Sequence, residues 1–152
     1  MLVQKNHFFN IVFFILLIII CIMLINFNNK KEMRVCFQNH CFDVELAINT
    51  EEKKKGLMFK EHLDMDKGML FVYEDEKERS FWMKNVLIPL DIIWINEKNE
   101  VVFISENTQL CDGSFCQNIN PGKDAKYVLE INAGLSKKIG LIIGDKIDFI
   151  EK

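Results

Sequence analysis

Hydrophobic and polar residues alternate in short runs along most of the chain, after one long apolar segment near the amino terminus. Residues 33–38 and 40–48 show the period of two that is typical of strands, and Gln38-Asn39 between them predicts a tight turn. Six further runs predict strands in the same way. They are residues 68–75, 79–85, 89–96, 101–107, 126–132 and 146–150.

Two short helices are predicted between these strands. Thr50 is expected to cap a helix over residues 51–58, and Asn132 a helix over residues 133–139 that ends at Gly140. The charged run 74–78 is expected to be a turn. The pattern therefore predicts a strand-dominated α+β domain, folded as an antiparallel curled sheet or a partly open β-barrel with two short helices.

The apolar segment differs from the rest of the chain. Residues 8–25 are eighteen positions interrupted only by Asn10, and they lack the polar face that a core helix would show. No small residues of a cleavage site follow them. We therefore expect an uncleaved signal anchor, a transmembrane helix over residues 8–27. It divides the chain into a flank (1–7), the anchor, a linker (28–32) and one globular domain (33–152).

Two signals disagree about the side of the membrane on which the domain lies. Lys30, Lys31 and Arg34 follow the anchor, whereas Lys5 precedes it, and this charge bias would leave the domain in the cytoplasm. The cysteines indicate an oxidising compartment, because four of them form two pairs of the same C-x4-C spacing. We expect the domain on the extracytoplasmic face.

The predicted hairpin gives the first cysteine pair a geometric basis. With the turn at Gln38-Asn39, Phe37 lies opposite His40 and Cys36 opposite Cys41, close enough for a disulfide. We expect disulfides 36–41 and 111–116, the second across the turn signal Asp112-Gly113-Ser114. A four-cysteine zinc site is the alternative.

Composition and motifs exclude several classes of function. Residues 33–152 contain 16 Lys and Arg but 21 Asp and Glu, without a basic stripe, so we expect no nucleic-acid partner. No glycine-rich phosphate loop, nucleophile elbow or metalloprotease helix occurs, and no cofactor is predicted. Soft ligands for copper are present, although methionines in an apolar domain are more simply core filler. These ligands are Met58, Met65, Met69, Met83, His40 and His62.

Four segments together resemble one uncharacterised family. They are GLMFKEHLDMDKGMLFVY, FWMKNVLIPLDIIWIN, KYVLEINAG and GLIIGD, of which FWMKN followed by PLDI is the most specific. The chain resembles domain of unknown function 192 over about residues 33–150. The resemblance implies a compact, strand-rich domain that is often exported behind a signal peptide or anchor, and it implies no established activity. The doubled C-x4-C pattern is not recognised as a feature of that family.

The segment SFWMKNVLIPLDIIWIN, residues 80–96, places polar side chains inside an apolar run. If 79–85 and 89–96 were consecutive strands, Lys84 and Asp91 would be neighbours across the turn. One interpretation is an ion pair that holds the fold. The other is the wall of a ligand-binding cleft, with Trp82 and Trp94 as stacking faces. The candidate ligand-binding residues are Trp82, Met83, Lys84, Asn85, Asp91 and Met58.

Three functional hypotheses follow. The first is a membrane-anchored, extracytoplasmic module that binds a small envelope ligand or a protein partner. The second is an enzyme of unknown class, for example a hydrolase, that uses Asp91 and Lys84, or a carboxylate pair of Asp91 and Glu130. The third is a structural envelope protein without a small ligand.

Overall fold

The computed structural model describes residues 12–21, 32–111 and 116–151. The chain divides into two compact units, Met1–Lys30 and Lys31–Lys152. In the first unit, residues 12–21 are helical, and the remainder of the expected anchor over 8–27 lies outside the described residues. None of the helices that the structure describes has the length and apolar character needed to cross a bilayer.

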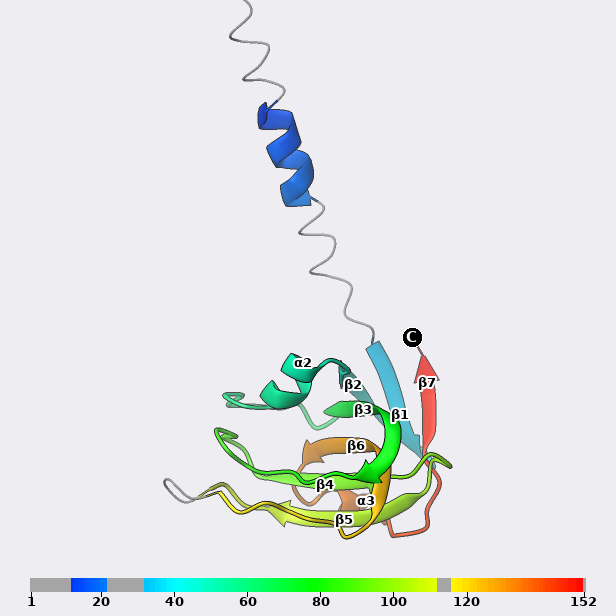
Figure 1. The fold of residues 1–152 in the computed structure, drawn as a ribbon. Helices are drawn as coiled ribbons and strands as arrows, with labels where there is room; N and C mark the ends of the chain where they lie inside the picture. The colour runs from blue at the N-terminus through cyan, green and yellow to red at the C-terminus, as the bar shows by residue number, and fades with distance from the viewer. Residues whose placement is uncertain (1–11, 22–31, 112–115, 152) are drawn as a thin grey trace, which may run out of the picture. The chain divides into compact units, whose positions relative to one another are not determined.

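The second unit is an α+β domain dominated by strands, as predicted (Figure 1). The strands, in chain order, are β1 (Glu32–Phe37), β2 (His40–Ala47), β3 (Lys67–Glu78), β4 (Leu90–Ile95), β5 (Val101–Thr108), β6 (Asp124–Asn132) and β7 (Asp148–Glu151). The helices are α2 (Thr50–Lys55) and α3 (Leu135–Ile139).

The seven strands form one sheet in the order β5-β4-β6-β3-β2-β1-β7. All neighbouring pairs are antiparallel except β2 and β3, which are parallel. The sheet is open, because β5 and β7 are its edges. It nevertheless curls, since Glu100 before β5 forms an isolated bridge with Lys146 before β7. The curled sheet expected from the sequence is therefore present, without closure into a barrel.

Each face of the sheet carries its own hydrophobic core. The first core contains residues from both ends of the sheet, such as Val35 of β1 and Ile95 of β4, so it fills the concave side. The second core lies on the opposite face. It includes Phe71, Trp94 and Val128, and its cover comes from the segments around α2 and residues 81–90. Because successive side chains of a strand point to opposite faces, nearly continuous apolar strands serve both cores.

The hairpin prediction is confirmed residue by residue. Phe37 pairs with His40 and Cys36 with Cys41, and the two sulfurs form a disulfide with a Cα–Cα distance of 4.1 Å. Cys111 and Cys116 form the second disulfide, across residues that lie outside the described part of the chain. Because these four sulfurs are bonded in pairs, they do not form the alternative zinc site.

One turn prediction and one strand prediction in the middle of the chain are wrong. The charged run 74–78 is not a turn but the second half of β3, which continues past an irregularity after Val72 and pairs again at Lys77. Residues 79–85 form no strand and make only an isolated bridge, from Phe81 to Ile119. Phe81 and Met83 instead fill the second core, so this segment is apolar because it covers a sheet face.

The helix caps also differ from the prediction. Asn49, rather than Thr50, caps α2 through a capping box with Glu52, whose side chain accepts a hydrogen bond from the Asn49 backbone. Gly134 begins α3, while the predicted cap Asn132 donates its side-chain amide to the Leu63 carbonyl. Gly140 ends α3 at φ 74°, as expected of a left-handed terminal glycine.

Candidate functional site

Asp91 is a buried residue that holds three parts of the domain together through hydrogen bonds. Its side chain is fully shielded from solvent, and its carboxylate accepts four hydrogen bonds. Oδ1 accepts from the backbone amides of Asn107 (2.7 Å) and Gly134 (2.9 Å). Oδ2 accepts from the amide (2.8 Å) and the hydroxyl (2.6 Å) of Ser136. This carboxylate therefore joins the start of β4 to the end of β5 and to the first turn of α3.

Lys84 is not the partner of Asp91, and the predicted ion pair is wrong. Lys84 is exposed, and its ammonium lies 5.2 Å from the centre of the Trp82 ring. The prediction assumed that residues 79–85 form a strand beside β4, which they do not. The two side chains also belong to different faces. Asp91 pairs with Ile131, a first-core residue, whereas Lys84 lines a pocket over the second core.

The carboxylate pair of Asp91 and Glu130 is excluded by the same register. Asp91 lies opposite Ile131 in the pairing of β4 with β6, so these two residues share a face. Glu130 precedes Ile131 on β6 and therefore points to the other face. An enzyme that uses Asp91 together with Lys84 or Glu130 is thus not supported by the geometry.

A small pocket over the second core brings together several of the predicted site residues. It is formed by the end of α2, by β3 and β6, and by the segment 81–86, with a cavity volume of about 30 Å³. This volume accommodates one or two water-sized groups. The lining residues are Lys53, Lys54, Lys55, Gly56, Leu57, Met58, Phe71, Phe81, Trp82, Lys84, Val86 and Glu130.

Glu130 is the unusual member of this lining. It is 3% exposed, and its Oε2 atom has no hydrogen-bond partner among the described residues. Its strand neighbours on the two sides are Met69 and Ile92, both apolar. Burial in these surroundings raises the pKa of Glu130 from 4.5 to about 8, so the carboxyl group is mostly protonated at neutral pH.

Two glycines bring the backbone close to Glu130. A Cβ atom on Gly68 of β3 would lie 2.7 Å from the Glu130 carbonyl oxygen, a distance that forbids any side chain there. Gly56, at φ 48°, follows α2 and faces the Glu130 side chain. A Cβ there would lie 3.9 Å from Oε2 and 3.2 Å from the Phe71 ring. Gly68 therefore permits the close approach of β3 to the β6 backbone, and Gly56 leaves room beside the Glu130 carboxyl group.

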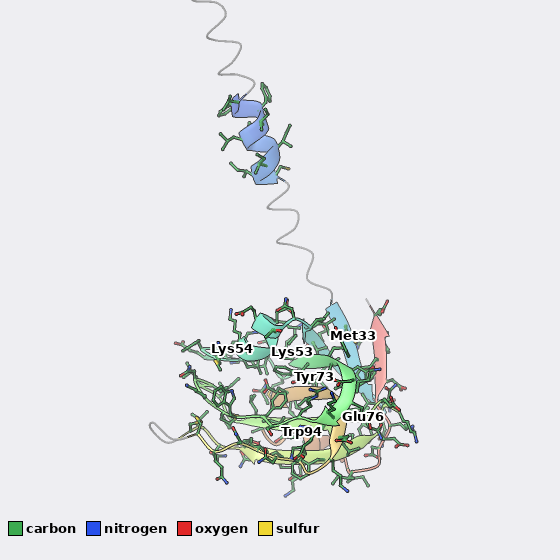
Figure 2. The ribbon with its side chains drawn as sticks, viewed as in Figure 1. Met33, Lys53, Lys54, Tyr73, Glu76 and Trp94 are labelled. Atoms are coloured by element: carbon green, nitrogen blue, oxygen red, sulfur yellow. A yellow bond between two sulfur atoms is a disulfide. The ribbon has the colours of Figure 1, made fainter. Side chains whose placement is uncertain are left out.

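Four lysines belong to the lining of the pocket. Three consecutive lysines of α2 and Lys84 line it, and none of the four forms an ion pair with another described residue. The Lys53 ammonium lies 4.5 Å from the centre of the Tyr73 ring. Both residues are labelled in Figure 2. Arg79 stacks on the same ring at 4.1 Å. Burial raises the pKa of Tyr73, Arg79 lowers it, and Glu130 raises it further, so Tyr73 and Glu130 are electrostatic neighbours.

The six predicted ligand-binding residues have different positions. Met58, Trp82 and Lys84 line the pocket, and Trp82 is 42% exposed. Met83 is buried in the second core beneath it. Asn85, in a left-handed turn at φ 57°, supports the pocket wall by accepting a hydrogen bond from the Phe59 amide through its carbonyl. Asp91 lies on the other face.

The place of Glu130 in this pocket was not predicted from the sequence. Its only local signal is a glutamate flanked by apolar residues in the strand KYVLEIN, at the same parity as Val128. That parity places it on a core face, which is an exceptional position for a carboxyl group. The lysines of α2 carry no local signal of a binding site, and only the packing of α2 beside residues 81–86 places them at a pocket.

A second hollow, of about 240 Å³, is larger, but charged side chains in its lining form ion pairs with one another. Lys60 pairs with Glu45 at 2.7 Å and Lys67 with Asp43 at 3.1 Å. Among the described residues, no group of three or more histidine, cysteine or acidic side chains is arranged to hold a metal ion. Of the methionines considered for copper, Met69 and Met83 belong to the second core and Met65 is exposed.

Comparison with solved structures identifies relatives that cover nearly the whole domain. The chain is 31% identical to a proposed transcription regulator from Sinorhizobium meliloti, with a TM-score of 0.71, covering 79% of this chain and 93% of that one. It is 34% identical to a protein of unknown function from Novosphingobium aromaticivorans, with a TM-score of 0.70, covering 77% and 83% respectively. Comparison with curated proteins found no match.

The family comparison covers most of the chain. Residues 23–149 match a family described as an uncharacterized ACR, and this range includes both glycines, Trp82, Lys84 and Glu130. The chain belongs to this family, DUF192.

Proposed function

We propose that the domain is a small-ligand binding module whose binding site is the Glu130 pocket. The observation that carries this proposal is the buried Oε2 atom of Glu130, which has no partner among the described residues although Glu130 belongs to the lining of a pocket. An unsatisfied buried polar atom costs roughly 1–3 kcal/mol. A ligand that hydrogen-bonds to Glu130 would remove this cost, and it would also contact Trp82 and Met58 at the wall.

The binding proposal is tested by nuclear magnetic resonance with a set of small carboxylates, amides, amines and sugars. We expect members of the set to shift the amide signals of Gly56 and Leu57 and the indole signal of Trp82, because these groups line the pocket. Trp82→Ala should weaken binding severalfold through the loss of its contact surface. Ile143→Ser changes an exposed residue outside the pocket and serves as the matched control.

Two results would count against this site. One is a full set of compounds that leaves the pocket signals unmoved, which would favour the structural envelope protein. The other is binding that shifts Asp43 and Lys67 in the larger hollow and is unaffected by Trp82→Ala. The Sinorhizobium relative is described as a transcription regulator. We do not propose that this chain binds DNA, because its domain is acidic and has no basic stripe.

The second part of the proposal is that a membrane anchor over residues 8–27 holds the domain on the extracytoplasmic face. The apolar run 8–25 and the two disulfides support it. Disulfides persist in oxidising compartments and are rare in the cytosol, and this argument outweighs the positive charges after the anchor.

The location is tested by expressing the full chain in a Gram-negative bacterium and alkylating its thiols before lysis. We expect membrane fractionation and no alkylation before lysis, because Cys21 lies within the anchor and the other four cysteines form disulfides. In denaturing detergent Cys21 should react, and a reductant should then expose four more thiols. A Cys111→Ser/Cys116→Ser variant is the control and should gain only two on reduction. Five reactive thiols without reductant, or a chain in the soluble cytoplasmic fraction, would contradict this location.

A further inference from the structure

The depth and charge of the pocket restrict the chemistry of what it binds. Its cavity of about 30 Å³ admits a terminal group of a few atoms and no ring. Phe71, Phe81 and Val86 contribute apolar walls. Glu130 is the acidic residue in the lining, and every other charged residue there is a lysine. A ligand group that enters this pocket therefore meets a carboxyl group in an apolar recess that is also lined by lysine side chains.

We propose that the pocket binds small organic carboxylates end-on. One carboxylate oxygen of the ligand accepts a hydrogen bond from the protonated Glu130 carboxyl group, and the lysines compensate the negative charge of the ligand. This inference rests on the proposed binding function and names its ligand class. A hydrogen bond from a neutral carboxyl to a carboxylate is charge-assisted and is among the strong ones. The organic remainder of the ligand lies against Trp82 and Met58 at the exposed wall.

Other charged groups near Glu130 favour the same arrangement. Lys53, Lys54 and Lys55 contribute from α2, and Lys84 contributes from the segment 81–86. From β3, Tyr73 is an electrostatic neighbour, and Arg79 lies over its ring. The strand partner on β4, Ile92, brings no charge. Lysines therefore predominate among the charged residues that line the recess, and we expect it to favour an anion over an amine.

Protonation of Glu130 makes this binding depend on pH. With a pKa of about 8, the carboxyl group holds its proton at about pH 6.5 and has lost it at about pH 9.5. The ionised form has no proton to donate, and it repels the carboxylate of the ligand. Because only the protonated fraction binds, the affinity should fall about thirtyfold between these two pH values.

The test compares propionate and benzoate with propionamide and benzamide, which have nearly the same shapes but no charge. Titrations followed by nuclear magnetic resonance on the full chain in detergent give the affinities at about pH 6.5 and about pH 9.5. We expect at least one carboxylate to bind at least tenfold more tightly than its amide at the lower pH. Its affinity should then decline at the higher pH in the wild-type protein.

Three variants separate the contributions. Glu130→Gln retains an N–H donor without the titration, so binding of the carboxylate should persist and lose most of its pH dependence. Glu130→Leu removes the donor while keeping a similar side-chain volume, and it should abolish binding of the carboxylate. Lys84→Met, at an exposed position, should weaken the binding of the carboxylate severalfold and leave the affinity for the amide unchanged. Thermal unfolding of each variant verifies that it is folded.

The outcomes distinguish this inference from the proposed function. If amides bind as tightly as carboxylates, or if carboxylate affinity is equal at both pH values in the wild-type protein, the carboxylate inference is overturned and the binding site remains. If neither these probes nor the broader compound set shifts Gly56, Leu57 and Trp82, both proposals are overturned.

Discussion

Glu130→Gln is expected to stabilise the protein by roughly 3 kcal/mol at about pH 7 and by roughly 5 kcal/mol above pH 8. The folded protein raises the pKa of Glu130 from 4.5 to about 8 by burial. Between these values the unfolded chain has released the proton and the folded chain retains it, so stability falls as the pH rises. Each pH unit in this interval removes about 1.36 kcal/mol, and glutamine at this position does not titrate.

The measurement is the free energy of unfolding by urea at several pH values between 5 and 9, for both proteins. The difference between the two curves should be small near pH 5, grow with pH, and level off above pH 8. Glu106→Gln removes the same chemical group at an exposed position of β5 and should follow the wild-type curve. Parallel curves for wild type and Glu130→Gln over the whole range would contradict a buried, protonated Glu130.

Asp91→Ala is expected to destabilise the protein by roughly 3–5 kcal/mol, and most of the loss should come from donors left without an acceptor. The substitution removes the acceptor from three backbone amides and from the Ser136 hydroxyl. Asp91→Asn preserves the volume but turns an NH₂ group toward one pair of these donors. We therefore expect it to cost somewhat less, about 2–4 kcal/mol.

Lys84→Met is the matched comparison for Asp91. It changes the cation that the sequence suggested as the partner of this carboxylate, and it should alter the free energy of unfolding by no more than about 0.5 kcal/mol. Thermal and urea unfolding of the three variants provide the measurement. Equal destabilisation by Asp91→Ala and Lys84→Met would indicate an ion pair between these residues and contradict their separation on two faces.

Local patterns were sufficient where neighbours in sequence are also neighbours in space. The hairpin of β1 and β2 is predicted correctly to the residue, because a tight turn at Gln38-Asn39 determines the register and the register aligns Cys36 with Cys41. The end of α3 at Gly140 follows from the same kind of local rule. Most strands were located for this reason, although their ends moved by one to three residues.

Local patterns failed for residues 74–85, where tertiary contacts decide the structure. A charged run becomes the second half of β3 because β6 supplies a partner strand at Lys77 and Glu78. An apolar run that resembles a strand instead covers the second core. It cannot pair with the strands before and after it in the chain, because β3 and β4 each already have two neighbours in the sheet. Strand pairing depends on a partner that periodicity alone does not reveal.

The same distinction applies to the candidate site. The sequence by itself determined which side chains are exceptional: a carboxylate and a cation near an apolar run, and a glutamate inside a strand. Only the tertiary structure decided their partners, because β4 and β6 direct Asp91 and Glu130 to opposite faces of one sheet. Asp91 meets backbone donors and becomes structural, whereas Glu130 meets apolar walls and lysines. The chemistry of a carboxyl group depends on this environment, and the fold alone supplies it.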